Sequence, residues 1–187
     1  MDKHISFPDF SIEGVEQKDV LRALDFDIKD TLCLEEAERY IWPYSDKLIE
    51  KNKIRTIISE ELDNWIFIYW SSDIDEHIKE VINILMKVSN GRINYHSMDS
   101  VTSDYHWIIA NQGKIIREFY SCWNIEINEG KPLTELENKF IASFENDEFI
   151  FGEDVCQSIY ELTCGVNLKK YKNDTKFKVG NVILSEN

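Results

Sequence analysis

The run Asn64-Trp65-Ile66-Phe67-Ile68-Tyr69-Trp70 constrains the fold of this chain more than any other segment. A strand with one solvated face alternates apolar and polar residues, because successive side chains point to opposite faces of the sheet. Here every residue from Trp65 to Trp70 is apolar or aromatic. The run therefore predicts a central strand covered on both faces. The β-branched stretch Lys53 to Ser59 is its predicted hairpin partner, joined through residues 60–63.

Helical spacing of apolar residues predicts amphipathic helices around that strand. Two short helices are expected, from Glu16 to Leu24 and from Leu34 to Ile41. A third is expected to begin with Asp73 as its N-cap, because Glu76 follows three residues later and a stripe of apolar residues continues to Leu85. Asn90-Gly91 is the predicted left-handed stop of that helix.

Two further helices are predicted in the last third of the chain. One begins at a capping box formed by Thr134 and Glu137 and runs to about Phe144. The other begins near Gly152 and ends at Gly165. The last predicted strand runs from Phe177 to Leu184.

A hairpin is predicted between the strands Asp104 to Ala110 and Lys114 to Trp123. The connection Asn111-Gln112-Gly113 supplies a glycine where a bulged three-residue turn needs positive φ. A short strand is also expected from Arg92 to Tyr95. The strands are mostly joined by hairpins and the helices cluster near the ends, which favours an α+β fold with a mixed or antiparallel sheet and packed helices.

The chain contains no linker-like composition, low-complexity tract or repeat of fixed period. Its 187 residues, 43% of them hydrophobic, match one core. We therefore expect a single domain over residues 1–187. In it, a helical N-terminal part, about 16–42, packs on the sheet-containing remainder.

The chain has 35 acidic and 21 basic side chains, for a net charge of -14. Residues 1–62, 63–128 and 129–187 are each net negative, so the charge belongs to the folded domain and not to a tail. Such a field repels phosphate backbones and attracts basic proteins. We therefore expect no direct nucleic-acid ligand, and interpret the lysines between Lys169 and Lys178 as a solvated turn or internal counter-charge.

The N-terminus lacks the pattern of a signal peptide, and no run approaches the ~20 apolar residues of a membrane span. The four cysteines show neither CxxC spacing nor a dense disulfide framework. These features predict a cytoplasmic protein with reduced thiols and no membrane association.

Two groups of residues could carry chemistry. Asp73, Asp75, Glu76 and His77 could ligate a divalent cation, but carboxylates that complement a helix N-terminus explain them better. The second group is His96, Ser97, Asp99, Asp104 and His106, with Cys122 on the neighbouring strand. It could supply a thiol–imidazole pair, the basis of a small hydrolase or metal enzyme. No glycine-rich phosphate loop, HExxH or EF-hand is present. We expect no enzyme activity, cofactor or metal.

The segment Glu145 to Asp154 combines carboxylates with a central apolar group. Acidic side chains steer a basic partner, and an apolar anchor among them supplies binding energy. The alternative is a core strand whose last carboxylates complement the next helix. The predicted partner-binding residues are Glu145, Asp147, Glu148, Phe149, Glu153 and Asp154, together with Asp73, Asp75 and Glu76.

Three short stretches carry a resemblance to known proteins. They are Trp107-x-x-Ala110-x-x-Gly113-x-x-x-Arg117-x-Phe119, Gly130-Lys131-Pro132-Leu133-Thr134-x-x-Glu137 and Phe151-Gly152-Glu153-Asp154-Val155. Their pattern resembles small uncharacterised bacterial proteins and names no activity.

In size and charge the chain also resembles the immunity proteins of bacterial toxin systems, including contact-dependent growth inhibition. That resemblance implies a protein that binds a cognate toxin domain, often a basic nuclease, and occludes its active site. The open alternatives are the enzyme above and a non-catalytic adaptor or structural domain whose acidity only confers solubility.

Overall fold

The computed structural model describes residues 8–41, 53–71, 77–99, 102, 104–145, 153–164 and 174–183, with only the backbone of Glu145, Glu153, Asp154 and Cys164. Its helices are α1 (Gln17–Ala23), α2 (Leu34–Ile41), α3 (Ile78–Leu85), α4 (Glu135–Glu145) and α5 (Glu153–Cys164). Its strands are β1 (Phe10–Glu13), β2 (Asp27–Cys33), β3 (Lys53–Ser59), β4 (Trp65–Trp70), β5 (Arg92–Asp99), β6 (Asp104–Asn111), β7 (Lys114–Cys122), β8 (Asn124–Glu129) and β9 (Lys176–Ile183).

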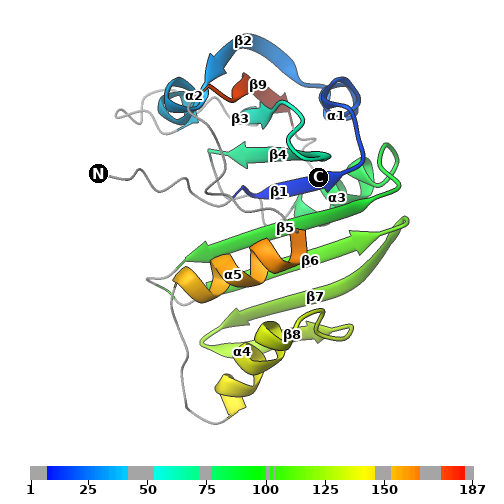
Figure 1. The fold of residues 1–187 in the computed structure, drawn as a ribbon, viewed down its shortest axis with the longest axis vertical. Coiled ribbons are helices and arrows are strands. Elements are labelled where there is room, and N and C mark those ends of the chain that lie inside the picture. Colours follow the sequence, from blue (N-terminus) through cyan, green and yellow to red (C-terminus); the bar gives the residue numbers. More distant parts are fainter. Residues whose placement is uncertain are drawn as a thin grey trace.

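The described strands form one nine-stranded sheet in the order β2-β9-β3-β4-β1-β5-β6-β7-β8, and every neighbouring pair is antiparallel (Figure 1). Helices pack on this sheet, which confirms the predicted α+β class. β4 lies inside the sheet between β3 and β1, and all of its residues are buried. The prediction of a central strand covered on both faces is therefore confirmed.

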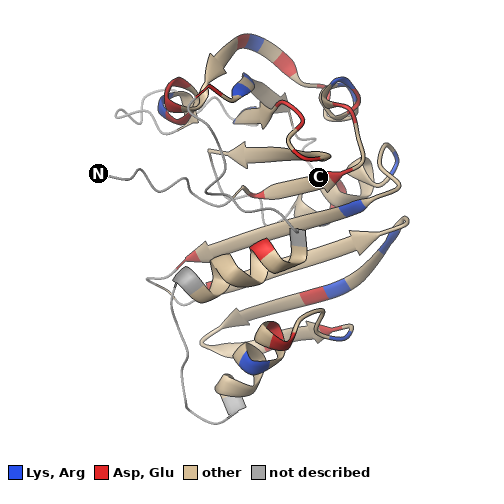
Figure 2. Cartoon of the chain, viewed as in Figure 1, with Lys and Arg blue, Asp and Glu red and all other residues tan. Residues whose placement is uncertain are grey.

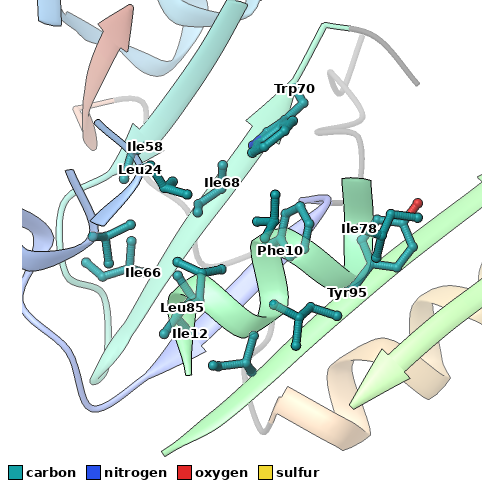
Figure 3. Close-up of a cluster of buried hydrophobic side chains, with 14 of the residues drawn as sticks. Phe10, Ile12, Leu24, Ile58, Ile66, Ile68, Trp70, Ile78, Leu85 and Tyr95 are labelled. Carbon is teal, nitrogen blue, oxygen red and sulfur yellow. The ribbon is translucent and has the colours of Figure 1, made fainter. Parts of the chain in front are cut away.

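The first face of the sheet is covered by α1 and α3. Ile66, Ile68 and Trp70 of β4 pack there beside residues of β1 and β5 in a single buried cluster (Figure 3). The stripe on α3 completes the cluster with Ile78, Val81, Ile82 and Leu85, all buried. The apolar spacing that predicts the helix is therefore the face that it buries.

The second face is covered by α2, α4 and α5. α2 packs Leu34, Ala37 and Ile41 against the alternate residues of β4, which are Trp65, Phe67 and Tyr69. Further along the sheet, α4 and α5 cover β6 and β7 through Phe140, Ile159 and the stacked rings of Trp107 and Phe119. The two sets of side chains on β4 thus belong to two separate cores.

The sequence does not predict three of the strands. β1 is short, and β2 has three charged residues among its seven and is mostly exposed. β8 alternates isoleucine with polar residues without a preceding glycine or proline. β1 nevertheless lies inside the sheet, between β4 and β5. The region 16–42, predicted to be helical, contains α1 and α2 and also β2 between them.

The predicted end of α3 is wrong, and its predicted N-cap, Asp73, lies outside the described residues. The described helix begins at Ile78, with His77 in the N-cap position. It ends at Leu85, before Asn90-Gly91, and Gly91 does not have positive φ. Gly91 is instead required by close approach, because a Cβ there would lie 2.5 Å from the carbonyl oxygen of Glu13. The predicted short strand after it extends to Asp99.

The predicted hairpin of β6 and β7 is present, but its turn has two residues and not three. Gln112 and Gly113 both have positive φ, and Asn111 pairs with Lys114. The bulge is not in the turn itself but in the adjoining ladder, between Ile109 and Ala110 of β6. β7 ends at Cys122, so Trp123, predicted to be its last residue, forms the turn to β8.

Candidate functional site

Most of the predicted partner-binding residues lie outside the described residues. These are Asp73, Asp75, Glu76, Asp147, Glu148 and Phe149. Glu145 is the last residue of α4, and Glu153 and Asp154 are the first residues of α5, each described by its backbone alone. The interface predicted at Glu145 to Asp154 therefore stays a prediction.

α5 begins at the end of the sheet where β5 and β7 finish (Figure 1). Near the C-terminus of α5, the carbonyl of Thr163 accepts a hydrogen bond from the guanidinium of Arg92, at the start of β5. Val155, in the first turn, packs with Tyr105 and Met98, near the start of β6 and the end of β5. Glu153 and Asp154 thus begin a helix at the end of the sheet where β5 and β7 finish.

The structure does not bring His96 and His106 together. His96 pairs with Trp107 across the β5–β6 ladder, and His106 pairs with Ser97, so the two histidines leave opposite faces of the sheet. His96 is buried, and its ring stacks on that of Trp107. Burial, with a smaller contribution from the charge of His106, lowers the pKa of His96 from 6.5 to about 4. It is a neutral core residue at physiological pH.

Cys122 lies on the same face as His106, but its surroundings disfavour a nucleophile. A hydrogen bond with the Asp104 carboxylate raises the pKa of the Cys122 thiol, and partial burial and the charges of Asp104 and Glu126 raise it further. Because the thiolate is the reactive form, a raised pKa reduces reactivity at neutral pH. The arrangement around Cys122 is opposite to that of an activated cysteine.

A second polar group on this face involves α3. The buried carboxylate of Glu118 on β7 accepts from the ammonium of Lys79 at 2.9 Å, and Nε2 of His106 lies 3.9 Å away. Lys79 is mostly exposed, so its charge stays partly hydrated while it neutralises Glu118. This group ties α3 to β7.

The best-organised polar group in the described residues is buried beneath α4. Arg117 of β7 and Glu137 of α4 are both 0% exposed, and their Nε–Oε1 distance is 2.6 Å. The same carboxylate oxygen accepts from the indole of Trp107 at 3.0 Å. Nη1 of Arg117 donates to the carbonyls of Glu118 and Glu129. The network locks β6, β7, the end of β8 and α4 together.

Glu137 also organises the start of α4. Its backbone N–H donates to the Thr134 hydroxyl at 3.0 Å, as the predicted capping box requires. Its Oε2, however, accepts from the N–H of Leu133 and so reaches one residue beyond the expected partner. In a capping box this carboxylate accepts from the N–H of the N-cap residue, here Thr134. In this structure the N–H of Leu133 takes that place.

Two of the three stretches that resemble small bacterial proteins contribute residues to this network. Trp107, Arg117 and Glu137 form it, and Phe119 packs against Trp107. Gly130 has a φ of 78° and passes so close to β7 that a Cβ there would lie 2.2 Å from the carbonyl oxygen of Ile116. These two stretches therefore help to build this part of the fold. In the third stretch, Phe151 and Gly152 lie outside the described residues.

The lysine and arginine residues of β5–β8 lie towards one end of the strands, with carboxylates beside them (Figure 2). One end, here called the Gly113 end, carries Arg92, Lys114 and Lys131 beside the β6–β7 turn. The other, the Trp123 end, carries Asp99, Asp104 and Glu126 around the β7–β8 turn. Residues 93–99, 104–111 and 118–130 contain no lysine or arginine. The Trp123 end is therefore acidic, because the strand segments that form it carry carboxylates and no lysine or arginine.

Trp123 protrudes from this acidic end. Its side chain is 65% exposed, and its φ is 64°. Cys122 and Asn124 pair on either side of it. Sequence reasoning missed this turn because no glycine, proline or Asn-Gly pair marks it.

The N-terminal half of the sheet carries a second surplus of carboxylates. The basic residues of α1, β2 and α2 lie next to carboxylates of the same segment, in the pairs Lys18–Glu16, Arg22–Asp19, Lys29–Asp27 and Arg39–Glu35. Asp25, Glu61 and Asp63 are exposed nearby. The local cations are thus matched, and the surface stays net negative.

No family model, curated protein or solved structure matches this chain. In the described parts of the chain, no group of three or more His, Cys, Asp and Glu residues is arranged to hold a metal ion. Among those same residues, no helix has the length and apolar character to cross a membrane.

Proposed function

We propose that this chain is an acidic immunity protein that binds a basic bacterial toxin domain and neutralises it by covering its active site. The observation that carries the proposal is the net charge of -14, distributed over the folded surface. A field of this sign attracts a basic protein and accelerates its association. Occlusion requires a rigid surface and no chemistry, so the proposed mechanism is non-enzymatic.

Two features of the described residues support a binding role over a catalytic one. His96 and His106 leave opposite faces of the sheet, and the carboxylates beside Cys122 raise the pKa of its thiol. In the described residues, the polar pair of Arg117 and Glu137 is wholly buried beneath α4 and serves packing. Acidic side chains outnumber basic ones 35 to 21, which suits a basic partner.

The test is titration of the purified chain with the basic toxin domain encoded beside its own gene, inactivated so that it can be produced. We expect tight binding, and an association rate that falls about tenfold or more as salt rises from low to physiological concentration. In a separate assay with the active toxin domain, loss of its activity on addition of the chain would complete the demonstration. An absence of binding contradicts the immunity function, and binding indifferent to salt contradicts electrostatic steering.

The predicted interface has its own test. The double substitution Asp147→Lys and Glu148→Lys should weaken binding, more strongly at low salt. Asp27→Lys on the edge strand β2 is the control, since Asp27 is exposed and far along the sheet from α5. Equal losses from both variants, after correction for total charge, would favour a general solubility role for the acidity.

A further inference from the structure

Trp123 is the least explained large side chain in the described structure. Trp65, Trp70 and Trp107 are buried and contribute to the cores, but the Trp123 side chain is 65% exposed. Exposed tryptophan is costly to hydrate and is enriched at the energetic centres of protein interfaces. Core packing therefore does not account for this residue.

Backbone conformation does not account for it either. The φ of Trp123 is 64°, in the left-handed region where a bulky side chain is disfavoured and glycine or asparagine is preferred. The comparable turn at the other end of β7 places Gln112 and Gly113 at positive φ. A strained residue that also gains little from burial points to a role outside the folding of the chain.

The surroundings of Trp123 indicate what it would contact. Asp104 faces Cys122 across the ladder, Asp99 faces Asp104, and Glu126 follows on β8. None of the strands that form this end carries a lysine or arginine there. Guanidinium and ammonium groups both stack on indole faces and pair with carboxylates, and arginine does so most readily.

We propose that the Trp123 end of the sheet is the anchoring surface for the basic partner, with Trp123 as the aromatic anchor and Asp99, Asp104 and Glu126 as its acidic rim. This inference rests on the proposed function and locates its binding surface. α5 begins at the same end of the sheet (Figure 1). The occupant is an arginine- or lysine-rich protein surface.

The test compares Trp123→Gly with wild type. Glycine adopts positive φ without strain. If Trp123 has a binding role, Trp123→Gly should therefore bind the partner more weakly while the fold loses no stability. The control is Leu162→Ala, which truncates another exposed side chain, 60% exposed, near the opposite end of α5. Trp123→Asn, which also suits positive φ, and Trp123→Phe, which keeps an aromatic ring, complete the set.

Two probes are titrated, a nona-arginine peptide and the basic toxin domain encoded beside the gene. We expect Trp123→Gly and Trp123→Asn to weaken binding of the toxin domain about tenfold or more. Trp123→Phe should retain part of the affinity, and Leu162→Ala should bind as wild type does. The peptide should bind wild type weakly and in a salt-dependent way, and Trp123→Gly more weakly still.

The outcomes separate the two proposals. If wild type binds neither probe, the proposed function fails and this inference fails with it. If wild type binds and Trp123→Gly binds equally well, the anchor is refuted while the immunity function stands. If Trp123→Gly loses affinity only together with a lowered melting temperature, Trp123 is a packing residue and the anchor is also refuted.

Discussion

The chain reverses direction at both ends of β7, but different residues form the two turns. Both must reverse the chain through positive φ, and the Gly113 end does so with Gln112 and Gly113. The Trp123 end does so with one exposed tryptophan. Near the Gly113 end the strand is also held from within by the pair Arg117–Glu137, which is buried beneath α4. We interpret the Gly113 end as stabilising the fold and the Trp123 end as exposing a side chain for contact with a partner.

The largest expected effect comes from breaking that internal support. Arg117→Met leaves the Glu137 carboxylate buried and unpaired, and should destabilise the fold by about 3–5 kcal/mol. Urea unfolding followed by tryptophan fluorescence measures it. The double variant Arg117→Met with Glu137→Leu should recover part of the loss, because no buried charge remains. Additive losses in the double variant would contradict a coupled pair.

The next effect concerns His96 on the covered face of β5. Its pKa is lowered to about 4 in the folded state, whereas the unfolded state titrates near 6.5. The unfolded state therefore binds more protons between these values, and stability falls as pH drops from 6.5 towards 4. The full loss is on the order of 3 kcal/mol.

Thermal unfolding from pH 7 to pH 4 measures this dependence. His96→Phe keeps a ring against Trp107 and cannot titrate, so its stability should vary less with pH than that of wild type over this window. Parallel curves for the two proteins would show that His96 does not carry the dependence.

These stability effects also mark what the sequence could predict. The apolar run of β4 and the stripe of α3 are strong periodic signals, and both elements form as expected. The Thr134–Glu137 box gave the start of α4. The second role of Glu137, as the partner of Arg117, depends on strands 20 residues away and has no local signature.

The missed features have a common physical reason. β1 and β2 are specified by their neighbours in the sheet, since β1 is only four residues long and β2 is mostly exposed, with three charged residues among seven. Gly91 signals a close approach to Glu13, and the sequence cannot separate that from a left-handed stop. The Trp123 turn lacks turn-forming residues, so a continuous strand was the simpler interpretation. The sequence predicts an acidic interface elsewhere, at Glu145 to Asp154, and it points neither to Trp123 nor to the carboxylates around it as partner-binding residues.

A smaller effect is expected in the β6–β7 turn. Gly113 has a φ of 72° with open space around its Cα, so Gly113→Ala strains the backbone without a clash. The substitution should lower stability by about 1 kcal/mol, or ~2–4 °C in melting temperature. Differential scanning calorimetry measures it, with Lys114→Ala as the neighbouring control. An unchanged melting temperature in Gly113→Ala would show that a Cβ at position 113 does not strain the turn.

The smallest effect tests the acidic rim. Asp104→Asn removes one charge beside Cys122 and weakens its hydrogen bond, so the pKa of the thiol should fall towards its ordinary value. Alkylation of Cys122 at mildly alkaline pH should become a few-fold faster, because reactivity follows the thiolate fraction. Peptide mass spectrometry separates Cys122 from Cys33, which serves as the internal reference. Equal alkylation rates in wild type and Asp104→Asn would show that the Asp104 carboxylate does not affect the Cys122 thiol.

The central claim is that Trp123 is held for contact with a partner and not for folding. The melting temperature of Trp123→Gly tests it most directly and requires no identified partner. Because glycine favours positive φ and the tryptophan buries little, the account predicts a rise of about 2–4 °C, the equivalent of ~1 kcal/mol. A fall of similar size would show that Trp123 stabilises the fold, and would contradict the account.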